Sequence, residues 1–159
     1  MPTADRTTIR AAIEALTSSF RANLAADPPT ATKPFRRILI GAAGADAFAR
    51  PHLTLAMTRA RTLAGVDDDH VVEVTLTLHV VTDVTADDAH GDVLDQIGAI
   101  EDHLDGLADA GVIEGAEGPS ARVWSFDYPR ATSGARVIAA SATQAMIVKV
   151  ERSQNRVPA

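Results

Sequence analysis

The sequence predicts an α+β fold in which a mixed, mainly antiparallel sheet with a long protruding hairpin packs against two amphipathic helices. Two periodicities lead to this prediction. Apolar and polar residues alternate along residues 52–62 and again along 70–82, as in strands with one buried face. Apolar residues recur every three or four positions along 6–25 and 86–109, as in helices with one buried stripe.

The first helix is expected over residues 6–25. Asp27-Pro28-Pro29 ends it, because proline cannot continue the hydrogen-bond ladder of a helix. The stretch Pro28–Pro34 is predicted to be a stiff, extended linker. A short apolar strand, Phe35–Ile40, and a glycine- and alanine-rich loop at 41–49 follow it. The buried stripe of the helix comprises Ile9, Ile13, Leu16, Phe20 and Leu24.

The strands 52–62 and 70–82 are separated by Gly65–Asp69, which has the composition of a turn, so they form a long antiparallel hairpin. The alternation along 71–82 corresponds to roughly 40 Å at 3.3 Å per residue, which is long for a domain of this size. The tip of the hairpin is therefore expected to stand clear of the body of the domain.

The second helix, expected over 86–109, is capped by Thr85 and is about 35 Å long. Asp105 and Asp109 lie near its C-terminus, where the helix dipole disfavours acidic side chains, so helix energetics do not explain them. Its apolar stripe comprises Val93, Ile97, Ile100, Leu104 and Leu107. Its polar face carries Asp92, Asp95, Glu101, Asp102, Asp105 and Asp109.

After a glycine-rich loop, the segment Val123–Tyr128 is predicted to be a short strand. Residues 135–150 give either a closing hairpin or one long bent strand. Residues 1–150 are thus predicted to form a single α+β domain. The polar segment 151–159 is predicted to be a C-terminal arm that becomes ordered on assembly.

Composition excludes several classes of function. The chain has no cysteine, which rules out a disulfide framework and a thiolate zinc site. No apolar stretch approaches the roughly 20 residues that span a bilayer, so we expect no membrane association and assembly in the cytoplasm. With a net charge of −6 and no basic–aromatic cluster, the chain is not expected to grip nucleic acid by its phosphates.

Charge is segregated along the chain. Residues 1–66 hold nine Lys or Arg and four Asp or Glu, whereas 67–118 hold fifteen acidic residues and no Lys or Arg. Residues 119–159 hold six basic and two acidic residues. An acidic middle between basic flanks predicts oppositely charged faces, although a simply solvated acidic face is an equally good explanation.

No catalytic site, cofactor site or metal site is predicted. Asp67-Asp68-Asp69 with His70 lies at the predicted hairpin tip and lacks the ligand order of an EF-hand, so a polar turn is the better interpretation. The serines have no nucleophile-elbow motif. Gly41–Gly44 is not followed by the lysine and hydroxyl residue of a phosphate-binding loop.

The pattern between Thr8 and about Arg152 resembles the tail terminator (tail completion) proteins of tailed bacteriophages and related phage-tail-like particles. Three pieces carry the resemblance: the alternating strand Val71–Thr82, the step Asp83–Asp88 into the second helix, and the strand Arg122–Tyr128 before a last strand ending near Val150. These three pieces are similar to the corresponding parts of that family in their residue pattern and in their length.

This resemblance implies a structural virion protein without cofactor or reaction. It implies a homo-oligomeric ring, typically a hexamer, at the head-proximal end of the tail. The ring would cap the tail-tube protein and join it to the neck and head-completion proteins. DNA would pass through its lumen without specific binding.

Exposure and charge select the residues expected at subunit interfaces. The linker and loop at 28–50, the hairpin tip 59–70 and the arm 151–159 are the segments expected to reach neighbouring subunits. His79 lies on the polar side of the long strand, and the acidic helix face supplies two more candidates. The full set is Arg36, Arg37, Arg50, Arg59, Arg61, Asp67, Asp68, Asp69, His79, Asp102, Asp105, Arg152 and Arg156.

Two alternatives remain open. The nearer one is another phage head–tail connector or neck protein, or a tail-tube component, since these also combine a hairpin and a helix on a small sheet. The farther one is a small-molecule-binding or enzymatic α+β domain of ferredoxin-like type, which would need polar groups converging in a pocket.

Overall fold

The α+β class is confirmed by a computed structural model, which describes residues 8–41, 49–63, 69–84, 89–115, 122–129 and 136–151. The predicted helices and strands are present within these ranges. In chain order the elements are α1 (Thr8–Leu24), β1 (Arg37–Ile40), β2 (His52–Leu63), β3 (Asp69–Asp83), α2 (Ala89–Asp109), β4 (Ile113–Glu114), β5 (Ser125–Asp127) and β6 (Val137–Glu151).

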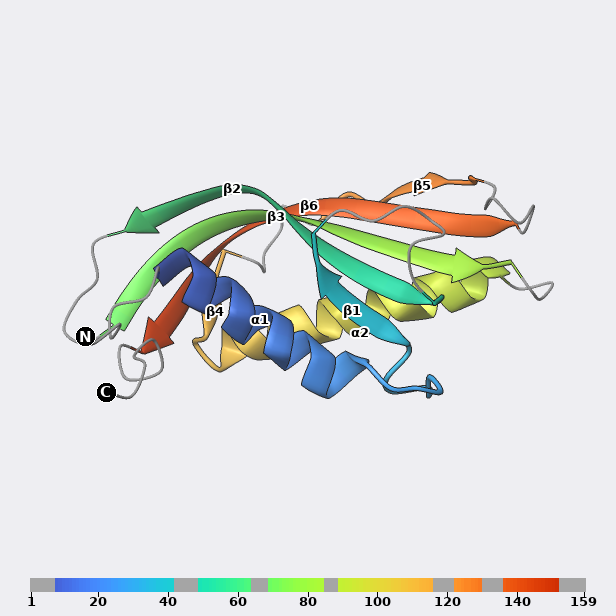
Figure 1. Ribbon diagram of the computed structural model, residues 1–159, viewed down its shortest axis with the longest axis horizontal. Coiled ribbons are helices and arrows are strands. Elements are labelled where there is room, and N and C mark those ends of the chain that lie inside the picture. The colour runs from blue at the N-terminus through green and yellow to red at the C-terminus, as the bar shows by residue number, and fades with distance from the viewer. Residues whose placement is uncertain are drawn as a thin grey trace.

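One mixed, curled sheet contains the strands, in the order β1-β2-β3-β6-β4, and β5 pairs with the opposite end of β6 from β4 (Figure 1). Only β1 and β2 run parallel among these pairs; the others are antiparallel. The predicted hairpin is formed by β2 and β3, although its turn at 64–68 lies outside the described residues. β6 pairs with β3 from Asp69↔Glu151 to Asp83↔Val137, so a third strand accompanies the hairpin along its length.

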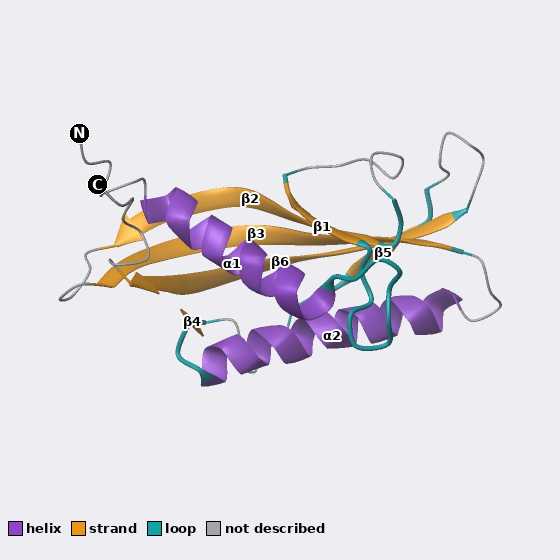
Figure 2. Ribbon diagram, turned by 60° about the horizontal axis from the view of Figure 1, so that its bottom comes forward, coloured by secondary structure: helices purple, strands orange, loops and turns teal. Residues whose placement is uncertain are grey.

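Both helices cover the same face of the sheet, as Figure 2 shows. α1 packs across β1, β2, β3 and β6, whereas α2 packs against β3, β4 and β6. The alternate residues of β3 that face the helices are fully buried: Val72, Val74, Leu76, Leu78 and Val80. They meet the predicted stripes of the helices, of which Phe20, Ile100 and Leu104 are among the largest buried side chains. The core therefore lies between the sheet and the two helices.

The structure settles or corrects several details. Residues 137–151 form one long strand, which decides between the two forms expected for the closing segment. β4 was not predicted, because glycines surround its two residues. The linker Pro28–Pro34 is not fully extended: it turns at Thr30, whose N–H donates to the carbonyl of Lys33 at 2.9 Å. The predicted cap Thr85 lies outside the described residues.

Candidate interaction surfaces

The exposed side of α2 is a row of carboxylates. Its members are exposed, and none forms an ion pair within the part of the chain that the structure describes. Glu101, by contrast, lies 3.2 Å from Arg122. Unpaired like charges on one helix repel one another, so the row gains stability when a cationic surface covers it. The row comprises Asp92, Asp95, Asp102, Asp105 and Asp109.

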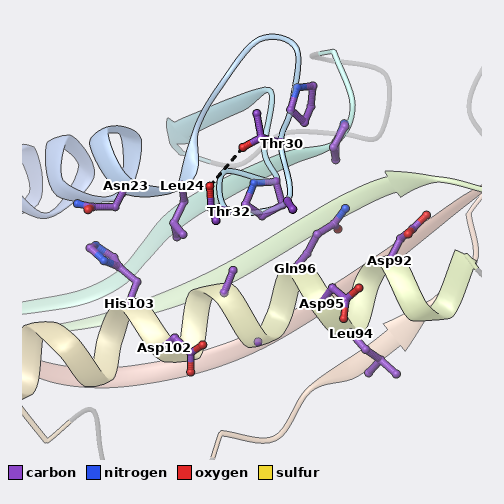
Figure 3. A pocket seen from close by; sticks show the side chains of 16 residues that line it. Asn23, Leu24, Thr30, Thr32, Asp92, Leu94, Asp95, Gln96, Asp102 and His103 are labelled. Atoms are coloured by element: carbon purple, nitrogen blue, oxygen red, sulfur yellow. Dashed lines mark hydrogen bonds between the residues drawn. The ribbon is translucent and has the colours of Figure 1, made fainter.

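A groove of about 910 Å³ runs between α2, the end of α1 and the turn at 29–34 (Figure 3). Its α2 wall holds Asp92, Asp95 and Asp102 together with Leu94, an apolar side chain that is 57% exposed. The opposite wall is formed by prolines and threonines of the turn. A surface that joins carboxylates to an exposed leucine suits a partner that is both cationic and apolar.

His103 also lines this groove and links the two helices. Its Nε2 atom lies 3.1 Å from the hydroxyl oxygen of Ser19, and its ring meets the ring of Phe20 edge to face at 4.8 Å. Burial disfavours the charged imidazole and lowers the pKa of His103 below its ordinary value of 6.5. This histidine holds the helices together rather than adding positive charge to the acidic row.

The opposite margin of the molecule is the edge formed by β1 and β2. β1 pairs with β2 only over residues 52–55, so in the described part of the chain no strand covers the outer edge of β2 beyond Leu55. At the point where this pairing ends, the side chains of Ile40 and Met57 are 46% and 45% exposed. Arg37 and Arg59 are exposed on either side of them and form no ion pair with the described residues.

Three other candidate arginines are engaged within the subunit. Arg36 forms an ion pair with Asp27 and donates from Nε to the carbonyl of Arg50. Arg50 donates from Nε to Asp83 at 2.6 Å, and Arg61 reaches Glu73 at 3.3 Å. These contacts hold the residues before β1 and β2 and the distal part of the hairpin. Arg37 and Arg59 therefore differ from Arg36, Arg50 and Arg61, which are engaged within the subunit.

The remaining candidates fall elsewhere. His79 lies in the middle of the sheet on the face opposite the helices, between Thr54 and Ser141 in the strand register. It is half-buried, and burial lowers its pKa. Asp69 begins β3. Asp102 and Asp105 belong to the acidic row. The other predicted residues, Asp67, Asp68, Arg152 and Arg156, lie outside the described residues.

The prediction from sequence missed the apolar members of both surfaces. Leu94 carried a usable signal, since it falls off the stripe of Val93, Ile97, Ile100 and Leu104 and onto the acidic face. Met57 carried none. It continues the alternation of Leu53 and Leu55, but it lies beyond the last residue of β2 that pairs with β1 and is exposed.

Neither a protein-family model nor a curated protein sequence matches this chain. Within the described residues, no three side chains of the metal-ligating types converge on one point. None of the described helices combines the length and apolar character that crossing a bilayer requires.

Proposed function

We propose that this chain is a tail terminator: the subunit of a ring that caps the end of a phage tail tube and joins it to the neck of the head. The observation that carries the proposal is that one subunit has two surfaces of opposite charge on different sides: the acidic face of α2 and the edge formed by β1 and β2. Helix α2, which carries the acidic row, lies along one side of the sheet, and β1 and β2 lie along the other (Figure 2). Arg37 and Arg59 are exposed on these two strands and form no ion pair with the described residues.

Such margins favour head-to-tail association. A contact between two different surfaces of the same chain is heterologous, and repeated heterologous contacts close into a ring when the rotation between neighbours permits. An acidic subunit also suits a ring around moving DNA, because it does not hold the phosphates. These features, together with the sequence resemblance, support a structural role in the virion.

The proposal is tested by assembly. The purified chain should form rings, with a mass of about six subunits by light scattering and a central hole in negative-stain images. Added to a growing tail tube made from the tube protein of the same phage, the chain should stop elongation at a substoichiometric amount. A chain that stays monomeric at high concentration and leaves tube growth unchanged contradicts the proposal.

The alternatives give different results in the same experiments. A neck protein would bind the portal-side components without stopping tube growth, and a tube component would extend tubes by itself. A small-molecule-binding domain would remain monomeric and gain thermal stability from a metabolite.

A further inference from the structure

We infer that the groove between α2 and the turn at 29–34 receives the C-terminal arm, residues 152–159, of a second copy of this chain, with Arg152 and Arg156 lying against the carboxylates of α2. The inference rests on the proposed ring and specifies one of the contacts that join neighbouring subunits in it.

The α2 wall of the groove presents one stripe of carboxylates. Asp92, Asp95 and Asp102 are exposed, and together with Ala99 they follow the 3-4-3 spacing of a single helix face. At 1.5 Å per residue, Asp102 lies about 10 Å from Asp95 and about 15 Å from Asp92 along the helix axis. Among the described residues that line the groove, none is Lys or Arg. The stripe therefore offers one negative site at Asp102 and another between Asp92 and Asp95.

The arm carries positive charge at a matching spacing. Arg152 and Arg156 are four residues apart, so in an extended chain they point to the same side and lie about 13 Å apart. This separation falls between the two spacings of the carboxylate stripe. One arginine therefore meets Asp102 while the other lies between Asp92 and Asp95. A guanidinium has five N–H donors in a planar fork, so it can donate to both carboxylates.

The remaining residues of the arm suit the opposite wall of the groove. In an extended chain Ser153 and Asn155 point away from the side of the arginines, and thus toward the turn. The hydroxyls of Thr30 and Thr32 line the groove there, as Figure 3 shows. Val157-Pro158 adds apolar surface that suits the prolines of the same wall.

The arm comes from a second copy, because the arm of the same subunit starts at the far end of the sheet. Gln96 lines the groove and accepts a hydrogen bond from Thr82 at 2.5 Å, and Thr82 pairs with Ile138. From Ile138 to Glu151, where the arm starts, β6 extends over about 43 Å. The five further residues to Arg156 span at most about 18 Å. An arm of the same copy therefore falls short of this part of the groove.

The sequence favours the arm over the other segments outside the described ranges. Residues 1–7 and 130–135 hold one arginine each, and the other such segments hold no Lys or Arg, whereas the arm holds two. Every copy has both a groove and an arm, so each gives one arm and accepts another. Contacts of this heterologous kind close into a ring when the rotation between neighbours permits.

The first test exchanges charge between the arm and the groove. The arm variant combines Arg152→Asp with Arg156→Asp, and the groove variant combines Asp95→Arg with Asp102→Arg. Each places like charges opposite each other and should associate at least about tenfold more weakly than the wild type in sedimentation velocity. Mixed in equal amounts, the two variants should regain association to within about threefold of the wild type. Every arm in the mixture then has a groove of opposite charge to bind.

The control for net charge lies on the same helix. Asp105→Arg combined with Asp109→Arg changes the net charge by the same amount as the groove variant, at two exposed positions that do not line the groove. This control should associate as the wild type does, and it should gain nothing from mixing with the arm variant.

The second test uses a disulfide, because the chain has no cysteine of its own. Gln154 lies midway between the two arginines on the same side of the extended arm, so it comes opposite Ala99 on the stripe. Oxidation of the variant with Ala99→Cys and Gln154→Cys should give disulfide-linked oligomers on a non-reducing gel. The matched variant with Asp105→Cys and Gln154→Cys should give none.

The outcomes separate the interface from the proposed function. If the wild type forms rings but the charge variants associate equally well, or if mixing them restores nothing, the interface is wrong and the ring stands. Disulfide-linked monomers would place the arm in the groove of its own subunit and overturn the exchange between copies. If mixing restores association but wild-type rings do not stop tube growth, the interface stands and the tail-terminator function fails. A wild type that stays monomeric overturns both. Circular dichroism of every variant shows whether the subunit remains folded.

Discussion

The Nε2 atom of His103 on α2 lies 3.1 Å from the hydroxyl oxygen of Ser19 on α1, beside the edge-to-face contact with Phe20. Burial lowers the pKa of His103 below 6.5, so at a pH near 6 the unfolded chain binds more protons than the folded one. The neutral His103 ring therefore contributes its full stabilisation of the folded state at pH values above the pKa of the unfolded chain. This contribution is lost as the pH falls through 6.5 toward the lower pKa of the folded state.

The free energy of unfolding, measured by urea denaturation, should therefore fall between pH 7.5 and pH 5.5. His103→Gln should reduce this fall without abolishing it, because burial lowers the pKa of His79 in the same direction. His90→Gln is the matched control, since His90 is an exposed histidine on the same helix. A His103→Gln chain whose stability depends on pH as strongly as that of the wild type would show that His103 is not responsible.

Two leucines on α2 test which face of the helix packs against the sheet. Leu104 is fully buried, so Leu104→Ala should lower the free energy of unfolding by about 2–5 kcal/mol. Leu94 is mostly exposed, so Leu94→Ala should change it by no more than about 0.5 kcal/mol. Thermal or urea unfolding of the two variants measures the difference. Equal losses would mean that the helix is rotated relative to the described packing.

Arg122 is the arginine whose loss should destabilise the subunit. Its side chain is 7% exposed, and it donates to Gln144 at 2.9 Å and to Glu101 at 3.2 Å. Arg122→Met removes these charged hydrogen bonds and should cost about 1–3 kcal/mol. Arg59→Met, at an exposed position, should cost less than about 0.5 kcal/mol. Urea unfolding compares the two, and the reverse order would contradict the described contacts.

Assembly should depend on salt. The acidic row of α2, Arg37 and Arg59 are exposed to solvent, where the Debye length falls from about 10 Å at 0.1 M salt to about 3 Å at 1 M. Light scattering should therefore show weaker association at 1 M NaCl than at 0.1 M. An assembly that strengthens with salt would indicate a contact dominated by apolar surface.

Periodicity predicted the elements that make up the core. The stripe of Ile13, Leu16 and Phe20 and the alternation of β3 each match one buried face, because burial imposes the same period on sequence and structure. The residues of β4 offered no such pattern. Its two residues are fixed by pairing Ile113 with Val148, a contact between segments far apart in the chain.

The candidate surfaces could be predicted only in part. The acidic row of α2 was visible in the sequence, since acids repeat on one side of the helix. Which arginines remain unpaired was not visible, because it depends on the three-dimensional positions of Asp27, Asp83 and Glu73. Exposure of Met57 depends likewise on where the neighbouring strand stops.

The position of β6 bears on the order in which this protein can be made. It is the last strand of the described fold, yet it lies between β3 and β4 in the sheet, and both helices pack against it. A nascent chain that has completed α2 still leaves the long edge of β3 unpaired and the buried faces of the helices partly open to water. Stable folding must therefore wait until translation has passed Val137–Glu151, and polypeptides released before that point are candidates for aggregation and proteolysis.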